Sequence, residues 1–169
     1  LQKYGISITL AVRIYQHYGQ SVYRVIEEDP YQLADHVSGI GFKTADEIAA
    51  KVGIHTDSDC RIRSGIFYTL LQSVGEGHVY MRQEVLLRRA SLLLGVEIMD
   101  MERYLQDLAM EKRIVLKKES CARRDGISGH GDGSELRIYA SRYYYLELNT
   151  AKMLHDLNVH AQTAKDAAA

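Results

Sequence analysis

Hydrophobic residues in the first third of the chain recur at helical spacing, and glycines interrupt them at matching places. Ala11 and Ile14 lie on one face of a helix that follows the tripeptide Gly5-Ile6-Ser7. The arrangement returns after Gly39-Ile40-Gly41. A glycine also follows each helix, where it can adopt the left-handed conformation that closes a helix C-terminus. The pattern predicts two copies of a tight glycine turn followed by a helix of about three turns.

The second copy contains more detail. Pro30 suits the first turn of a short helix that runs through about His36, with Asp29 as its N-cap. Residues 37–41 then form a hairpin loop, in which glycines permit positive φ and the close approach of another backbone. The pattern also predicts helices at 42–52 and 21–28, and no strand in this region.

After a turn at residues 53–58, helical patterns continue and then give way to strand-like segments. Helices are expected at 59–74, at 82–94 and from a cap at Asp100, a very short strand at 78–81, and strands at 113–118 and 136–140 that flank a flexible loop at 125–134. A last helix at 143–157 and a tail that is a linker or frayed end follow. The order helix, short strand, helix, helix, strand, loop, strand is typical of a winged helix.

Charge over the 169 residues is almost balanced, with 21 Lys and Arg against 22 Asp and Glu, so the net charge is −1. This excludes a chain-wide polycation that binds nucleic acid through bulk charge. No apolar run approaches the roughly 20 residues that cross a bilayer, so no membrane partner is expected. Cys60 and Cys121 allow at most one disulfide, which favours a reducing cytoplasm. Because the chain starts at Leu1, we expect a piece of a longer protein.

The turn at Gly39, Ile40 and Gly41 is the best candidate for chemistry. It places successive backbone amides at a helix N-terminus, where unpaired donors and the helix dipole can hold a phosphate. Lys43 can add a formal charge and Thr44 a hydroxyl donor. The alternative is a tight turn that needs glycine only for sterics. The duplicated pattern favours the phosphate site, since paired hairpins can clamp two phosphates across a groove.

Residues 37–49 resemble the helix-hairpin-helix motif, which binds the DNA backbone without reading bases. The first copy departs from that motif because Ser7 replaces the second glycine after Gly5, so this copy either contacts phosphate or is purely structural. Further segments occur in order: Asp29-Pro30-Tyr31-Gln32-Leu33, Asp57-Ser58-Asp59-Cys60-Arg61-Ile62 and Gly77-His78-Val79-Tyr80. Together they resemble the N-terminal region of RecD-like ATP-dependent DNA helicases, bacterial relatives of the exodeoxyribonuclease V alpha subunit.

The resemblance implies a mainly α fold. Its expected parts are a tandem helix-hairpin-helix domain at 1–56, a winged-helix-like domain with a small β-hairpin at 57–142, and a C-terminal helix and linker at 143–169 toward a motor domain. In such a family, a superfamily 1 motor that uses ATP and Mg²⁺ moves 5′ to 3′ on single-stranded DNA. The sequence contains no Gly-x-x-x-x-Gly-Lys-Ser/Thr loop to hold ATP phosphates. We therefore expect this chain to be no enzyme and to need no cofactor itself.

A second candidate surface is the expected hairpin, or wing. Residues 112–124 contain six basic residues and one acidic residue. A basic hairpin beside a helix-turn-helix favours phosphate contact, although a solvated strand edge rich in Lys is an equal alternative. Arg88 and Arg89 could join this patch or lie on an ordinary helix surface. The wing residues expected to contact DNA are Lys117, Lys118, Arg123 and Arg124.

Other features of the sequence give weaker evidence of function. Tyr143-Tyr144-Tyr145 could stack on bases, but a helix cannot turn all three rings one way, and packing in the core or against a motor is favoured. No Cys-x-x-Cys or His-x-x-x-His spacing points to a metal site, and no residues point to catalysis. The leading hypothesis is a non-catalytic, backbone-binding DNA module whose partners are single-stranded or forked DNA and a motor domain. The rival is a protein-docking scaffold.

Overall fold

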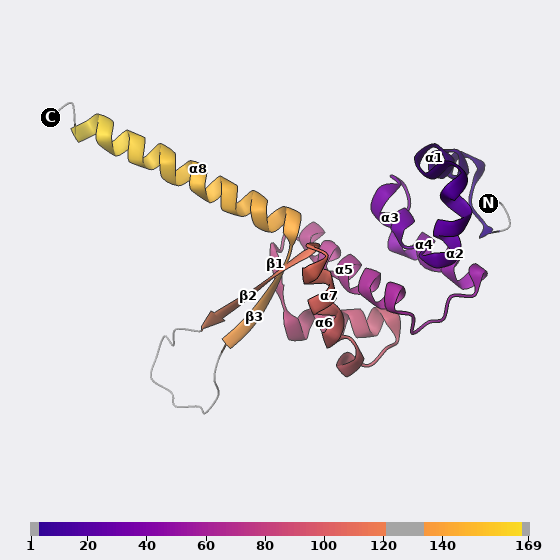
Figure 1. Cartoon of the computed structure of the whole chain (residues 1–169). Helices are drawn as coiled ribbons and strands as arrows, with labels where there is room; N and C mark the ends of the chain where they lie inside the picture. Colours follow the sequence, from indigo (N-terminus) through magenta and orange to yellow (C-terminus); the bar gives the residue numbers. More distant parts are fainter. Residues whose placement is uncertain (1–3, 121–133, 167–169) are drawn as a thin grey trace.

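The structure is a computed structural model, and it describes residues 4–120 and 134–166. The chain is mainly helical, with one small sheet and a long final helix that projects away from the rest (Figure 1). The described N-terminal part includes α1 (Ile8–Tyr18), the 3₁₀ turn η2 (Gly19–Ser21), α2 (Val22–Glu28), α3 (Gln32–His36) and α4 (Phe42–Val52). For residues 4–56, the prediction of helices without strands is confirmed.

Local capping explains some of these boundaries. Ser7 caps α1, because its side chain accepts a hydrogen bond from the Leu10 amide at 3.4 Å. Gly53 ends α4 in the left-handed conformation, with φ 91° and ψ 23°. Gly19 has positive φ but ψ of −130°, so it closes α1 outside the left-handed helical region that we predicted.

The predicted N-cap of the short helix is wrong. Tyr31 occupies the N-cap of α3, two residues after Asp29. The Asp29 carboxylate instead accepts a hydrogen bond from the Tyr31 amide at 3.1 Å, which forms a turn before the helix. Pro30 lies in this turn and precedes the helix.

The second part follows the predicted order. Its elements are α5 (Asp59–Gly75), β1 (Tyr80–Arg82), α6 (Gln83–Leu94), the 3₁₀ turn η3 (Ile98–Asp100), α7 (Glu102–Met110), β2 (Ile114–Ser120), β3 (Ser134–Ala140) and α8 (Ser141–Asp166). Several boundaries differ from prediction. Met101 takes the N-cap of α7, one residue after Asp100. The final helix continues to Asp166, through much of the predicted tail.

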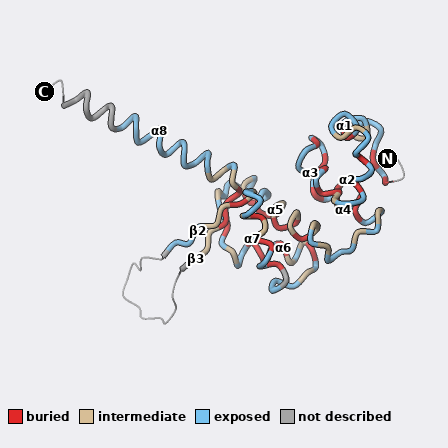
Figure 2. Tube along the Cα trace, in the orientation of Figure 1, coloured by how far each residue is buried: buried red, intermediate tan, exposed pale blue. Residues whose placement is uncertain are grey.

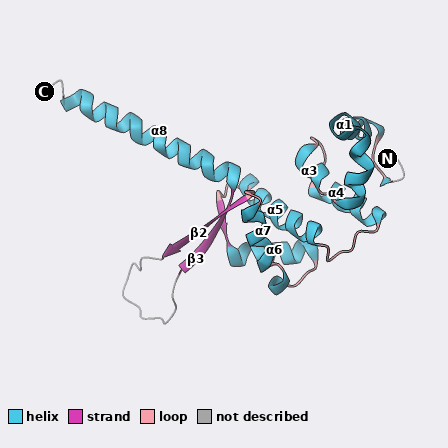
Figure 3. Cartoon of the chain, in the orientation of Figure 1, coloured by secondary structure: helices cyan, strands magenta, loops and turns pink. Residues whose placement is uncertain are grey.

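The three strands form one antiparallel sheet in the order β1-β3-β2 (Figure 3). The short strand pairs with β3 through Tyr80↔Tyr139 and Arg82↔Arg137, while β2 and β3 form the wing. One sheet face carries Met81 and Ile138, which are buried against the helices. The fold is therefore the expected winged-helix-like arrangement. Most of the loop predicted at 125–134 lies outside the described residues.

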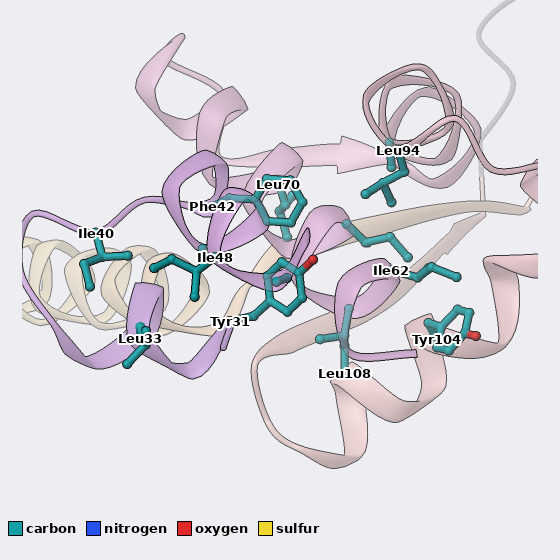
Figure 4. Packing of buried hydrophobic residues seen from close by; sticks show 14 of the residues in the cluster. Tyr31, Leu33, Ile40, Phe42, Ile48, Ile62, Leu70, Leu94, Tyr104 and Leu108 are labelled. Carbon is teal, nitrogen blue, oxygen red and sulfur yellow. The ribbon is translucent and has the colours of Figure 1, made fainter. Parts of the chain in front are cut away.

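A single apolar cluster joins the two parts (Figures 2 and 4). Leu33 and Ile48 from the N-terminal helices belong to the same buried cluster as Leu70 and Leu108 from the second part. Most of α8 beyond its first turns is exposed (Figure 2). No helix in the described part of the chain is both long and apolar enough to cross a membrane.

Helices α5 and α6 pack closely against each other at Gly65 and Leu94. A Cβ added at Gly65 would lie 2.6 Å from Leu94 Cδ2, which is nearer than side chains approach one another. Gly65→Ala should therefore lower the free energy of unfolding by roughly 1–2 kcal/mol, because crowding outweighs the gain in helix propensity.

Gly75→Ala is the matched control, since a Cβ at the end of the same helix meets nothing within 4 Å. It should leave stability unchanged or raise it slightly. Urea denaturation of both variants measures the difference. Combining Gly65→Ala with Leu94→Val should restore part of the loss, and a fully additive double variant would contradict the contact.

Candidate nucleic-acid interface

The loop between α3 and α4 holds the predicted phosphate-binding residues. Gly39 adopts φ of +96°, which favours glycine, and a bond from the Ile40 amide to the Val37 carbonyl at 3.2 Å tightens the turn. The Ile40 side chain is buried, so this residue anchors the hairpin in the core. Its amide already has a partner, which leaves the neighbouring amides as the better donors.

The N-terminus of α4 presents unpaired amides. Gly41 is its N-cap, no side chain caps this end, and the first turn contains no acidic residue. The first internal bond runs from the Ala45 amide to the Gly41 carbonyl at 3.1 Å, so the amides of residues 42–44 remain open. Lys43 is exposed beside them and Thr44 is half-buried. Four of the predicted residues, Gly39, Gly41, Lys43 and Thr44, thus surround one helix end.

Gly41 has no steric role inside the protein. Its φ is −102°, which any residue can adopt, and a Cβ built there meets nothing within 4 Å. The hairpin would fold with a side chain at this position. A glycine here keeps the helix end uncovered, which suits the approach of an external group.

Arg13 is a cation at this hairpin that sequence reasoning missed. It projects from α1, and its guanidinium donates a hydrogen bond to the Ser38 carbonyl at 3.3 Å. It also lies 3.3 Å from the position of a Cβ at Gly39. The contact joins residues far apart in the chain, and the repeat offers no signal because Arg13 aligns with Glu47 of the second copy.

The first hairpin is different because its own protein groups occupy it. A Cβ at Gly5 would collide with the Lys51 ammonium, which donates a hydrogen bond to the Tyr4 carbonyl at 3.1 Å. Ser7 caps the following helix. The two copies share a backbone pattern, but the helix of the second copy lacks the side-chain cap that Ser7 gives the first.

The wing residues lie far from this hairpin. Figure 1 shows the free ends of β2 and β3 pointing away from the α1–α4 region. Lys117 lies over the Tyr144 ring, 5.4 Å from its centre, and Lys118 is exposed. Of the residues that could have joined the patch, Arg89 pairs with Glu76 at 2.8 Å. Arg123 and Arg124 lie outside the described residues.

Two arginine–aspartate pairs attach the hairpin region to the second part. Arg61 of α5 binds Asp46 of α4 through two nitrogens, at 2.8 and 3.2 Å, and also donates to the carbonyls of Thr56 and Leu94. Tyr31 donates to the same carboxylate at 2.5 Å. Burial and then this hydrogen bond raise the pKa of the Tyr31 phenol, and the bond to Asp46 raises the pKa of Arg61.

The second pair joins Arg113 at the start of the wing to Asp35 of α3, at 2.7 Å. Arg113 also lies over the Phe67 ring, 4.1 Å from its centre. Burial raises the pKa of Asp35, although Arg113 opposes that shift. Arg113 is therefore engaged within the protein and does not belong to an open basic surface.

An aromatic stack holds the first residue of α4. The Phe42 ring stacks on Tyr31 at 5.6 Å on one side and on Tyr68 of α5 at 5.2 Å on the other. A cavity of about 290 Å³ beside this stack is bordered by Gly41 and Phe42. The open helix end is thus held in a fixed orientation relative to α5. No group of metal-binding side chains occurs within the described ranges.

The Asp46–Arg61 pair should contribute measurably to stability. Asp46→Asn leaves the mostly buried Arg61 without its counter-charge, so we expect the free energy of unfolding to fall by about 2 kcal/mol. Asp57→Asn, at an exposed position nearby, is the control and should change little.

A double-mutant cycle with Arg61→Gln tests whether the two side chains act together. The coupling energy should be about 1–2 kcal/mol in chemical denaturation. Additive losses from the two single variants would show that the pair contributes no joint stability.

Comparison with known families identifies the N-terminal region. The model described as "ATP-dependent RecD2 DNA helicase HHH domain" matches residues 1–80. The match extends beyond the hairpins through α5 and reaches Tyr80 in β1, so it includes both halves of the Asp46–Arg61 junction. It confirms the resemblance drawn from the hairpin and the segments that flank it. Residues 1–80 of this chain therefore match the helix-hairpin-helix domain of RecD2 DNA helicases.

Proposed function

We propose that this chain binds the DNA phosphate backbone without sequence preference, through the open N-terminus of α4. The observation that carries the proposal is the uncapped helix end at Gly41, with Lys43 exposed beside it. Amides at a helix N-terminus bind phosphate oxygens and read no base. Arg13 supplies a second cation at the same hairpin.

The chain's overall charge agrees with a local contact. With a net charge of −1, bulk attraction to DNA is weak, so affinity depends on a few placed donors. The first hairpin, with Gly5 and Ser7, serves as a structural support in this proposal because Lys51 binds its Tyr4 carbonyl and Ser7 caps the helix that follows. The wing residues Lys117, Lys118, Arg123 and Arg124 are proposed to add nonspecific affinity.

In a longer protein, we propose that the region guides DNA strands for a 5′–3′ helicase motor. ATP and Mg²⁺ would act in that motor. The family of residues 1–80 supports this role, because its model describes a domain of an ATP-dependent DNA helicase. A cytoplasmic location is proposed with it, in agreement with the free thiol at Cys60.

A docking scaffold is the second candidate. The exposed apolar side chains of α8 favour it, since Leu146, Met153 and Leu157 are each more than 60% exposed. A scaffold of this kind would leave isolated DNA unbound at any salt concentration. DNA binding that falls steeply as salt rises supports the phosphate contact.

Gly41→Asp tests the helix end directly. Asp is a favoured N-cap residue, and the extended backbone at this position accommodates it, so the variant should fold at least as well as the parent. Its carboxylate would occupy the open amides and repel phosphate. We expect the Kd for duplex DNA, measured by fluorescence anisotropy at low salt, to rise about tenfold.

Gly41→Asn is the matched control, because it adds a side chain of the same size without the charge. It should weaken binding much less than the aspartate. A folded Gly41→Asp variant that binds duplex DNA as tightly as the parent would rule out the phosphate site at this helix end.

Lys43→Gln tests the contribution of the adjacent cation. If Lys43 neutralises one phosphate, the slope of log K against log salt should become shallower by about 0.9. Anisotropy titrations across a salt series measure that slope. An unchanged slope would show that Lys43 does not touch the backbone.

A further inference from the structure

The outer face of the small sheet carries an unusual group of tyrosines. Tyr80 and Tyr139 are paired across β1 and β3, with ring centres 5.3 Å apart. The ring centres of Tyr139 and Tyr144 of α8 lie 5.3 Å apart, and those of Tyr144 and Tyr145 lie 5.3 Å apart as well. These four residues, named here the tyrosine platform, form a continuous chain of rings from β1 to α8.

The two ends of the tyrosine platform face solvent, whereas its middle is covered. Tyr80 is 37% exposed and Tyr145 is 56% exposed, while Tyr139 is buried. Packing of α8 against the sheet explains the covered rings. The terminal rings remain accessible to a ligand.

A row of cations runs across the same sheet face, two residues along the strands from the tyrosines. Arg82, Arg137 and Lys117 are direct cross-strand neighbours in the register of the three strands. Like charges placed opposite one another destabilise a sheet. Glu119 and Glu135 compensate Arg137 and Arg82 in part, at 2.6 and 3.2 Å. Lys117 has no carboxylate partner among the residues that the structure describes.

Cations and rings are interleaved. The Arg137 guanidinium lies 4.6 Å from the centre of the Tyr80 ring, and the Lys117 ammonium lies 5.4 Å from that of Tyr144. Beside them, a cavity of about 460 Å³ is lined by Tyr80, Arg82, Arg89 and Tyr139 among others. Aromatic rings next to basic groups along an open sheet face suit a chain of bases joined by phosphates.

We propose that the tyrosine platform and its row of cations bind single-stranded DNA. Bases would stack on the exposed rings of Tyr80 and Tyr145, and Lys117 and Arg82 would contact the backbone. An unpaired strand is favoured over a duplex because only unstacked bases offer their faces to the rings. The choice of DNA as the nucleic acid rests on the proposed function, but the site is separate from the α4 helix end.

The test uses the full chain and a fluorescent oligothymidylate of about 15 nucleotides, with a duplex of similar size as the second probe. Tyr80→Ala and Tyr145→Ala should each raise the Kd for oligothymidylate about tenfold at low salt and leave duplex binding unchanged. Tyr80→Phe should retain binding, because it keeps the ring and loses only the hydroxyl.

Lys117→Gln should raise the Kd for oligothymidylate a few-fold and make the salt slope shallower by about 0.7. The matched controls are Tyr23→Ala, an exposed tyrosine on α2, and Lys152→Gln, an exposed lysine farther along α8. Both should bind oligothymidylate like the parent. Circular dichroism confirms that each variant is folded, and Tyr139 is left intact because it is buried.

The proposal is overturned if the parent does not bind oligothymidylate, or if folded Tyr80→Ala and Tyr145→Ala bind it as tightly as the parent. It is also overturned if they weaken duplex and single strand equally. Gly41→Asp separates this result from the hairpin proposal. A loss of duplex binding in Gly41→Asp concerns the α4 end alone, and a loss of oligothymidylate binding in Tyr80→Ala concerns the platform alone.

Discussion

The double hydrogen bond between Arg61 and Asp46 determines how the hairpin region is oriented on the rest of the molecule. Arg61 is mostly buried and also donates to two carbonyls, one in the connection before α5 and one at the end of α6. A planar guanidinium can satisfy these acceptors together, and a lysine could not. Without Asp46, its charge would be desolvated and unpaired. The position of α4 therefore depends on this pair.

Phe42 connects the Arg61–Asp46 pair to the candidate phosphate site. The residue is the first of α4, and its ring is held between Tyr31 and Tyr68. Tyr31 also donates to Asp46, so the stack and the ion pair share one residue. The open amides are consequently presented by a helix fixed at its N-terminus by rings and farther along by charge. The family match to residues 1–80 includes α5, in agreement with a hairpin region that is not independent of this helix.

Local sequence signals predicted the elements well where glycines and apolar spacing agree. The helix expected at 42–52 is α4, because Gly41 and Gly53 bracket a strongly amphipathic segment. The last helix was predicted to end at residue 157, but α8 continues to Asp166. An exposed helix has no buried face whose apolar spacing would mark its length. Arg13 and Arg61 were not identified as site or junction residues. Their partners are distant in the chain, and only the fold brings them together.

The distribution of charge links the two proposed contacts. A chain with net charge of −1 cannot attract DNA over its whole surface, so its cations must be used locally. Several form ion pairs within the protein, as Arg61 and Arg113 do with Asp46 and Asp35. Among the exposed cations, Lys43 lies at the hairpin and Lys117 on the outer sheet face, and Figure 1 shows these two regions well apart. Since the junction holds these regions in one orientation, a backbone contact at α4 and a stacked strand at the sheet would lie at a fixed separation.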